Sequence, residues 1–408
     1  MLVEDGLLEW NKPIHNFCPE FRFKDVYLNE HVTISDILSH RTGLPSHDFV
    51  WMGFEPELTF MDKIKHLEVS KPFRTSYQYS NVLYCSVAEL IEKLSGKSFS
   101  KFVQERILNP LEMKSTFFSR EDTRKTSDFA LLYTIKEGKI TEVYDYDFKV
   151  VKGSGNINST AEDMAKFLQF QLNKGKVNGL ELISESNLTK THQPSTIIRS
   201  ALLNDLYPEK RLVHYPSYAH GWNCESFRGQ RLNYHGGSYK GSCHISCFLP
   251  DQKIGIDILT NTRESYLGFL LHYHVIERLL GFQQLDYVTL DEKLYSFVRD
   301  DIKKRNQSRE QNRIKNTKTS HPISDYTGKY HHPAYTDFEF IQTKEKLKAI
   351  FGIHECDVRH FNYNTFEVNV EMFDSKILVT FETNQNGQIN GLIIKSGCAQ
   401  EKTFYKKV

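Results

Sequence analysis

The chain has 408 residues, of which 39% are hydrophobic and 13% aromatic, a composition that supports large apolar cores and excludes a disordered chain. Lys and Arg number 52 against 51 Asp and Glu, so the charge balance favours neither nucleic acid nor an anionic membrane as a partner. The length indicates two domains, or one large domain with an appendage. The expected partner is a small-molecule or peptide substrate or another protein, and the oligomeric state stays open.

The first six residues, Met1 to Gly6, resemble the last turn of a helix that ends at a glycine. Since one turn does not form a stable helix alone, the body of that helix is expected upstream, and the chain is expected to be truncated at its N-terminus. The segment has no basic start and no apolar core, so it is not a secretory signal, and the compartment is by default the cytosol.

Further helices are expected at residues 32–40, at 86–94, after Ser98, and from Ser159 to Gly175. The pairs Ser86 with Glu89 and Ser159 with Glu162 each have the spacing of a capping box. An amphipathic helix at 266–282 contains charged side chains, so it is a globular helix and not a membrane span.

Strand patterns fill residues 232–261, which are expected to form neighbouring antiparallel strands. The tail again alternates polar and apolar residues, with an Asn386-Gly387 hairpin turn, and predicts a small barrel-like β unit. Three regions follow: residues 1–285, a basic linker at 286–320, and the β unit at 321–408. The linker is interpreted as a solvated helix, with an anion- or membrane-binding patch as the alternative.

Seven cysteines lie far apart, without any Cys-x-x-Cys pair. Their odd number and spacing argue against a disulfide framework and against a thiolate zinc site. Reduced, buried thiols are expected, and no metal site is predicted.

Tyr79 and Asn81 stand two residues apart in an extended turn and are expected to point the same way. A tyrosine can relay a proton, and an asparagine can hold a substrate carbonyl. The alternative is an ordinary turn with a half-buried aromatic residue.

His235, Gly236, Gly237 and Ser238 follow one another in a strand pattern. Paired glycines in a strand indicate that another group approaches the backbone closely, and a backbone N–H there can help to bind an oxyanion. The alternative is a β-bulge or a tight bend.

In order and spacing these motifs resemble the serine β-lactamase and penicillin-binding-protein family, in particular its esterase- and peptidase-like branch. The motifs that carry the resemblance are residues 3–13, Ile34 to Pro45, Tyr79-Ser80-Asn81, Gly153 to Asp163, and His235-Gly236-Gly237. Residues 326–335 and 360–366 resemble the lipocalin-like domain that follows some of these hydrolases. The resemblance implies an α+β fold, with an antiparallel sheet flanked by helices and a small β-barrel-like domain after it.

The resemblance also implies a mechanism without a metal or organic cofactor, in which a serine attacks an amide or ester and forms an acyl-enzyme. Tyr79 takes part in proton transfer, and Asn81 orients the substrate carbonyl. His235 supplies a polar group where relatives have lysine, and the strand at Gly236, Gly237 and Ser238 binds the substrate, with the Ser238 N–H as an oxyanion donor.

The Ser-x-x-Lys pair of this family is expected upstream of Met1. Residues 1–408 contain one such pair, Ser98 and Lys101, which is explained by Ser98 as a helix cap. Two hypotheses follow. The first is a serine hydrolase, inactive as this truncated chain; the alternative is a catalytically dead pseudoenzyme that binds a ligand or a protein.

Overall fold

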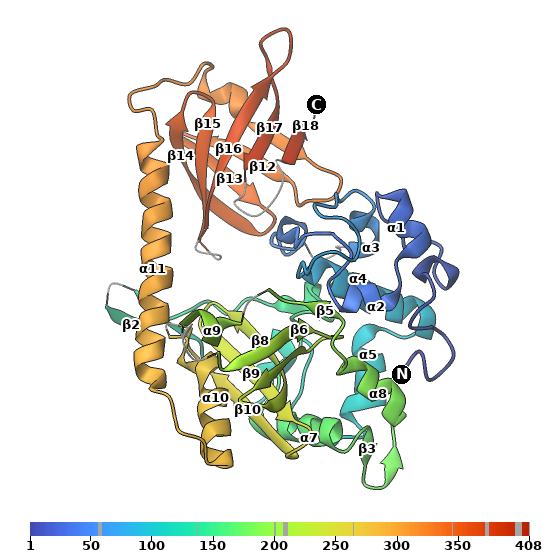
Figure 1. Ribbon diagram of the computed structural model, residues 1–408. Coiled ribbons are helices and arrows are strands. Elements are labelled where there is room, and N and C mark those ends of the chain that lie inside the picture. The colour runs from blue at the N-terminus through green and yellow to red at the C-terminus, as the bar shows by residue number, and fades with distance from the viewer. Residues whose placement is uncertain are drawn as a thin grey trace.

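The computed structural model shows a helix-rich part built on an antiparallel sheet and, above it, a β-barrel (Figure 1). It describes residues 1–55, 59–136, 138–199, 201–206, 211–263, 265–344, 346–371, 375–395 and 402–407. The described helices are α1 (Val26–His31), α2 (Ile34–Leu38), α3 (Phe60–Ile64), α4 (Asn81–Ser95), α5 (Phe99–Val103), α6 (Arg120–Thr123), α7 (Ala161–Leu172), α8 (Glu185–Thr191), α9 (Leu202–Leu206), α10 (Leu267–Leu280) and α11 (Tyr287–Gln311).

Six strands form the antiparallel sheet in the order β10-β9-β8-β7-β6-β5. Their bounds are β5 (Thr196–Ile197), β6 (Val213–Tyr218), β7 (Asn223–Phe227), β8 (Gln230–Tyr239), β9 (Ser242–Leu249) and β10 (Ile254–Thr260). Two hairpins lie outside it, β1 (Tyr133–Lys136) with β2 (Lys139–Glu142), and β3 (Lys176–Val177) with β4 (Leu180–Glu181).

Helices α7 and α10 cover opposite faces of this sheet. Cys247 of β9 packs in one hydrophobic cluster with Tyr273 of α10, whereas its neighbour Phe248 packs with Leu168 of α7. Successive residues of a strand point to opposite faces, so each face has its own helical cover. The predicted fold, an antiparallel sheet flanked by helices, is confirmed.

Strands β11 to β18 form a closed antiparallel barrel, which confirms the barrel predicted for the tail. They are β11 (Gly328–His331), β12 (Phe338–Thr343), β13 (Lys346–Phe351), β14 (His354–Asn362), β15 (Thr365–Val370), β16 (Ser375–Thr383), β17 (Ile389–Lys395) and β18 (Lys402–Lys406). Gly387, at φ +74°, lies in the turn between β16 and β17, as its Asn-Gly sequence predicts. Rings such as Phe340, Phe366 and Phe381 pack edge to face, so this barrel has an aromatic core.

The barrel packs directly on the segment that follows α2. Backbone N–H groups of Thr336 and Ile353 donate to the carbonyl oxygens of Phe49 and Gly53, at 3.3 and 3.0 Å. A Cβ on Gly352 would lie 1.9 Å from the Gly53 oxygen, so the two backbones touch. One hydrophobic cluster runs through both parts.

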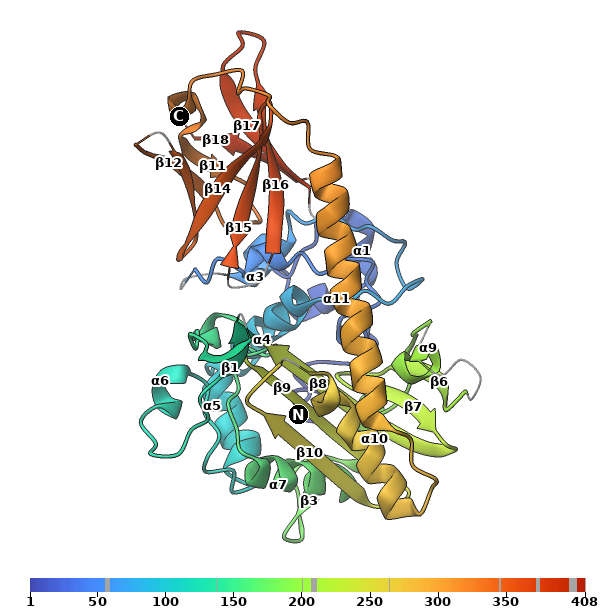
Figure 2. The same ribbon diagram turned by 90° about the vertical axis from the view of Figure 1, so that its left-hand side faces the viewer.

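Helix α11 lies in the predicted basic linker and runs along the outside of the molecule from the sheet to the barrel (Figure 2). Tyr287, Leu290 and Leu294 are buried, whereas most of the second half of the helix is exposed. Such a polar, exposed helix fits the interpretation as a solvated connection.

Both predicted capping boxes are wrong. Helix α4 begins at Asn81, five residues before Ser86, whose hydroxyl donates to the Val82 carbonyl within the helix. The carboxylate of Glu89 caps a different helix, because it accepts the N–H groups of Phe60 and Met61 at 2.7 and 2.8 Å.

The second box is displaced by one residue. Thr160 caps α7, and its hydroxyl accepts the N–H of Asp163 at 3.3 Å. Ser159 instead bonds Thr116 at 2.8 Å. Sequence spacing did not separate two adjacent hydroxyl residues that are both able to cap a helix.

Six cysteines, Cys18, Cys85, Cys224, Cys243, Cys247 and Cys356, are buried and free, as expected, while Cys398 lies outside the described residues. Within the described ranges, no group of three or more His, Cys, Asp or Glu side chains could hold a metal ion. No helix in the described part of the chain is long and apolar enough to cross a membrane.

Glu225 of β7 is buried between the sheet and α10. Its carboxylate accepts hydrogen bonds from the hydroxyls of Tyr273 and Tyr234, at 2.8 and 3.3 Å. Burial raises the pKa of Glu225 to about 7, because these two donors offset only part of the cost of burying a charge.

Replacing Glu225 by Gln is expected to flatten the pH dependence of stability. The folded state holds a proton that the unfolded chain has lost, so the wild-type free energy of unfolding falls with rising pH between about 4.5 and about 7, by up to about 1.4 kcal/mol per pH unit. Urea unfolding at both ends of this window measures the slope, and Glu339→Gln, on the exposed side of β12, controls for the lost charge. Equal slopes in the wild type and Glu225→Gln would contradict the assignment.

Candidate functional site

Tyr79 and Asn81 lie where an extended segment enters a helix. Ser80 between them is extended, at φ −145° and ψ 108°, and Asn81 is the first residue of α4. The Tyr79 side chain remains 38% exposed, enough for a ligand to reach it. The amide of Asn81 makes no hydrogen bond to any residue that the structure describes, so it is available to a substrate carbonyl.

His235 lies on β8 and joins a chain of hydroxyl groups. Its Nε2 lies 3.1 Å from the Tyr218 hydroxyl, which hydrogen-bonds that of Tyr84, and Tyr84 donates to the Leu38 carbonyl at 2.6 Å. This chain connects the sheet to α4 and α2 through the interior.

The structure brings Tyr79 and His235 together, with ring centroids 6.3 Å apart. Burial raises the pKa of Tyr79 to about 12 and lowers the pKa of His235 to about 4. Both groups are therefore neutral near pH 7, so the His235 ring can form hydrogen bonds but does not carry the positive charge of a lysine.

Gly236 and Gly237 are required by close packing on both faces of β8. A Cβ on Gly236 would lie 2.6 Å from Cε1 of Phe269 in α10, and a Cβ on Gly237 would lie 1.9 Å from Cε1 of His244. The register of β7 with β8 ends at Tyr234, whereas that of β9 continues beyond Ser238. From His235 onward, one edge of β8 thus has no strand partner among the described residues, and backbone N–H groups there can meet a ligand.

His40 is a site residue that the sequence pattern did not reveal. The stretch from Ile34 to Pro45 predicts only a helix end and a shaped loop, yet the His40 ring lies 4.4 Å from that of Tyr79 and 5.0 Å from that of Tyr218. The one available signal was its place in the family motif.

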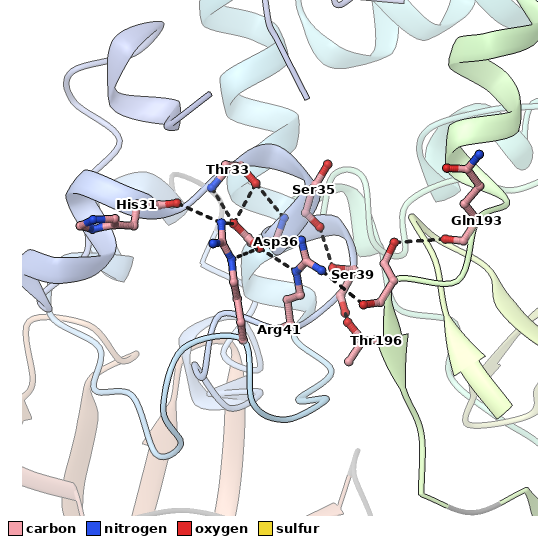
Figure 3. Close-up of polar contacts among 10 residues, drawn as sticks. His31, Thr33, Ser35, Asp36, Ser39, Arg41, Gln193 and Thr196 are labelled. Atoms are coloured by element: carbon pink, nitrogen blue, oxygen red, sulfur yellow. Dashed lines mark hydrogen bonds and ion pairs between the residues drawn. The ribbon is translucent and has the colours of Figure 1, made fainter. Parts of the chain in front are cut away.

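Asp36 of α2 anchors this region (Figure 3). Its fully buried carboxylate accepts Nε of Arg41 at 2.6 Å, and Nε and a terminal nitrogen of Arg74 at 2.8 and 2.7 Å. The N–H and hydroxyl of Thr33 add bonds of 3.0 and 2.8 Å. Burial raises the pKa of Asp36, but the bonds from Arg74 and Thr33 and the charge of Arg41 outweigh it, so the pKa is lowered overall.

The same network reaches the edge of the sheet. Arg41 donates to the carbonyl of Ser195 at 3.3 Å, and the hydroxyl of Thr196 in β5 donates to the carbonyl of Ser39 at 2.8 Å. Helix α2 is thereby fixed to the strand edge beside the site (Figure 3).

Ser98 acts as a helix cap. Its hydroxyl accepts the N–H of Lys101 at 3.3 Å at the start of α5, the role that its sequence predicts.

Replacing Asp36 by Asn is expected to lower the free energy of unfolding by about 3 kcal/mol, because two arginines then lose a buried counter-charge. Urea unfolding followed by tryptophan fluorescence measures the change. Asp251→Asn is the matched control, since Asp251 pairs with Arg231 in solvent and such pairs contribute at most about 1 kcal/mol. Similar losses in both variants would show that Asp36 is no anchor.

The chain is similar to known proteins in sequence and in fold. The sequence model of the family described as Beta-lactamase matches residues 1–277, and that of a domain of unknown function (DUF3471) matches residues 312–408. An unguisins hydrolase of Aspergillus campestris is 28% identical over 375 residues, covering 85% of this chain and 66% of its own length. Protein flp of Staphylococcus aureus is 23% identical over 279 residues, covering 67% of this chain and 51% of its own length.

This chain thus spans about half to two thirds of those relatives. Among solved structures, the octameric penicillin-binding protein homologue from Pyrococcus abyssi aligns with a TM-score of 0.58 at 19% identity, covering 99% of this chain and 84% of that one. A D-stereospecific amidohydrolase from Streptomyces aligns with a TM-score of 0.50 at 20% identity, covering 64% of this chain and 77% of that one. These likenesses concern the fold. The match of the family model over more than half of the residues shows that this chain belongs to the family described as Beta-lactamase.

Proposed function

We propose that this chain carries the proton-transfer and carbonyl-binding half of a serine hydrolase site, which cleaves an amide or ester in a small molecule or peptide through an acyl-enzyme. The observation that carries the proposal is the meeting of Tyr79 and His235, 6.3 Å apart by ring centroid, with the free amide of Asn81 beside Tyr79. A phenol, an amide and an open strand edge are the groups that such a reaction needs around a carbonyl.

Tyr79 acts as a proton relay in this proposal. With a pKa of about 12, Tyr79 keeps its proton near pH 7, so its hydroxyl can donate to a leaving amine or alcohol. To accept the proton of a serine it needs a cation beside it, because a neighbouring positive charge lowers the pKa of a phenol. The lysine of a Ser-x-x-Lys pair would meet this need.

Asn81 and β8 hold the substrate. The Asn81 amide donates to the carbonyl of the substrate, and the N–H of Ser238 is one donor to the oxyanion that forms on attack. Gly236 and Gly237 keep the strand flat enough for this approach, and neutral His235 orients the ligand through hydrogen bonding. The nucleophile is assigned to a serine of a Ser-x-x-Lys pair other than Ser98, whose hydroxyl caps α5.

Covalent labelling tests the proposal. The wild-type protein and its variants, purified from the protein's own source, are treated with a fluorophosphonate ester. The labelled serine is mapped by mass spectrometry together with the intact mass. We expect label on the serine of a Ser-x-x-Lys pair, and labelling of Tyr79→Phe slower by about 100-fold. Asp251→Asn, at an exposed ion pair, is the control for nonspecific damage. Label on Ser98, or equal labelling rates in Tyr79→Phe and Asp251→Asn, would contradict the proposal.

A ligand-binding pseudoenzyme is the second candidate, favoured by one observation: the single Ser-x-x-Lys pair of residues 1–408 caps a helix. It predicts that recombinant 1–408 unfolds cooperatively and binds an amide or ester without being labelled. Calorimetric titration with an uncleaved amide, compared between the wild type and Asn81→Ala, tests this reading. Aggregation of the recombinant chain, or no difference between the two proteins, would exclude it.

A further inference from the structure

His40 accepts hydrogen bonds from the backbone on both sides of Tyr79. Its carbonyl oxygen accepts the N–H of Gln78 at 2.8 Å, and its Nδ1 accepts the N–H of Ser80 at 3.2 Å. His40, just after α2, thereby fixes the backbone amides of the residues immediately before and after Tyr79.

The His40 ring is only 1% exposed and packs among four tyrosines. The ring centroids of Tyr77, Tyr79, Tyr84 and Tyr218 lie 5.7, 4.4, 4.9 and 5.0 Å from its own. Burial lowers the pKa of His40 to about 3, so the ring is neutral, and the proton is on Nε2 because Nδ1 accepts the Ser80 amide.

The backbone of His40 is itself constrained. Its φ of +55° lies in the left-handed region, which asparagine tolerates better than other residues with a Cβ. Because of this turn, the carbonyl oxygen and the ring nitrogen Nδ1 of His40 both face the extended segment around Tyr79.

We infer that His40 is a positioning residue for the proposed hydrolase: its Nδ1 and carbonyl oxygen fix the Tyr79-Ser80-Asn81 turn, and its ring packs Tyr79 against Tyr218, the hydrogen-bond partner of His235. The inference rests on the proposed function for its consequence in catalysis, but the positioning itself is measurable without turnover. His40 makes no direct contact with substrate in this assignment.

Two polar substitutions test whether a hydrogen-bond acceptor is needed at the position of Nδ1, or whether any polar side chain suffices. In His40→Asn the side-chain oxygen lies close to where Nδ1 was, and the left-handed backbone is kept. In His40→Gln the polar atoms lie farther out, near Nε2. Ser39→Ala is the neighbouring control, because the buried Ser39 hydroxyl bonds the Ser35 carbonyl and makes no contact with the turn.

Native-state amide hydrogen exchange is the first readout. We expect the Ser80 amide to exchange about fivefold faster in His40→Gln, while His40→Asn and Ser39→Ala stay near the wild type. The Gln78 amide is the internal reference, because its acceptor is a backbone oxygen that every variant retains. Equal Ser80 exchange in His40→Asn and His40→Gln would overturn the inference.

Should His40→Gln not fold, long-range ¹H–¹⁵N spectra of histidine-labelled wild-type protein decide instead. An unprotonated Nδ1 of His40 is expected, and a protonated Nδ1 overturns the inference.

Steady-state kinetics with an ester substrate then test whether the positioning of Tyr79 by His40 affects the reaction. We expect His40→Gln to lose about 10- to 100-fold in kcat with a small change in KM, and His40→Asn to recover most of it. A wild-type protein without any turnover or labelling counts against the proposed function, whereas the exchange and tautomer measurements still decide whether His40 holds the turn. If Ser80 exchange differs between His40→Asn and His40→Gln while their kcat values are equal, the catalytic part of the inference is overturned.

Discussion

The buried carboxylate of Asp36 is the interaction on which the arrangement of the site depends. It binds Arg41, the residue after His40, and Arg74, which precedes the extended segment that ends at Asn81. These segments are distant in sequence and have no strand pairing to align them. An isolated charge in the interior costs several kcal/mol, so five hydrogen bonds and two cations are needed to offset it, and they leave the carboxylate little freedom to adopt another arrangement.

Burial gives the site its chemical character. Tyr79, His40 and His235 are neutral near pH 7, since burial among rings raises the pKa of the phenol and lowers the pKa of both imidazoles. In the proposed function, such a site binds polar but uncharged groups such as a carbonyl, and it moves a proton efficiently only when a cation enters it. The chain of hydroxyls from His235 through Tyr218 and Tyr84 to the Leu38 carbonyl holds the two sides of the site together without adding charge.

Aromatic rings fill the described part of the barrel core, where a lipocalin holds its ligand. The contacts of the barrel with the rest of the chain include hydrogen bonds to backbone groups of residues 49–53, which follow directly from the loop after His40. Lys240, in the turn after β8, also donates to the Glu371 carbonyl of the barrel at 3.1 Å. The barrel therefore contacts two of the loops that flank the candidate site, the segment after His40 and the turn after β8.

The sequence predicted the fold class through the resemblance of its motifs to a known family, and it predicted the barrel through strand alternation and the Asn386-Gly387 turn. Motif spacing also singled out Tyr79, Asn81 and His235 as expected site residues. The sequence did not separate true helix caps from neighbouring hydroxyl residues at Ser86 and Ser159, since an N-cap depends on where the helix begins. Only the tertiary structure revealed Asp36, His40, Tyr84 and Tyr218 as parts of one assembly. Their roles arise from burial and from hydrogen bonds between distant segments, and neither leaves a periodic signal in the sequence.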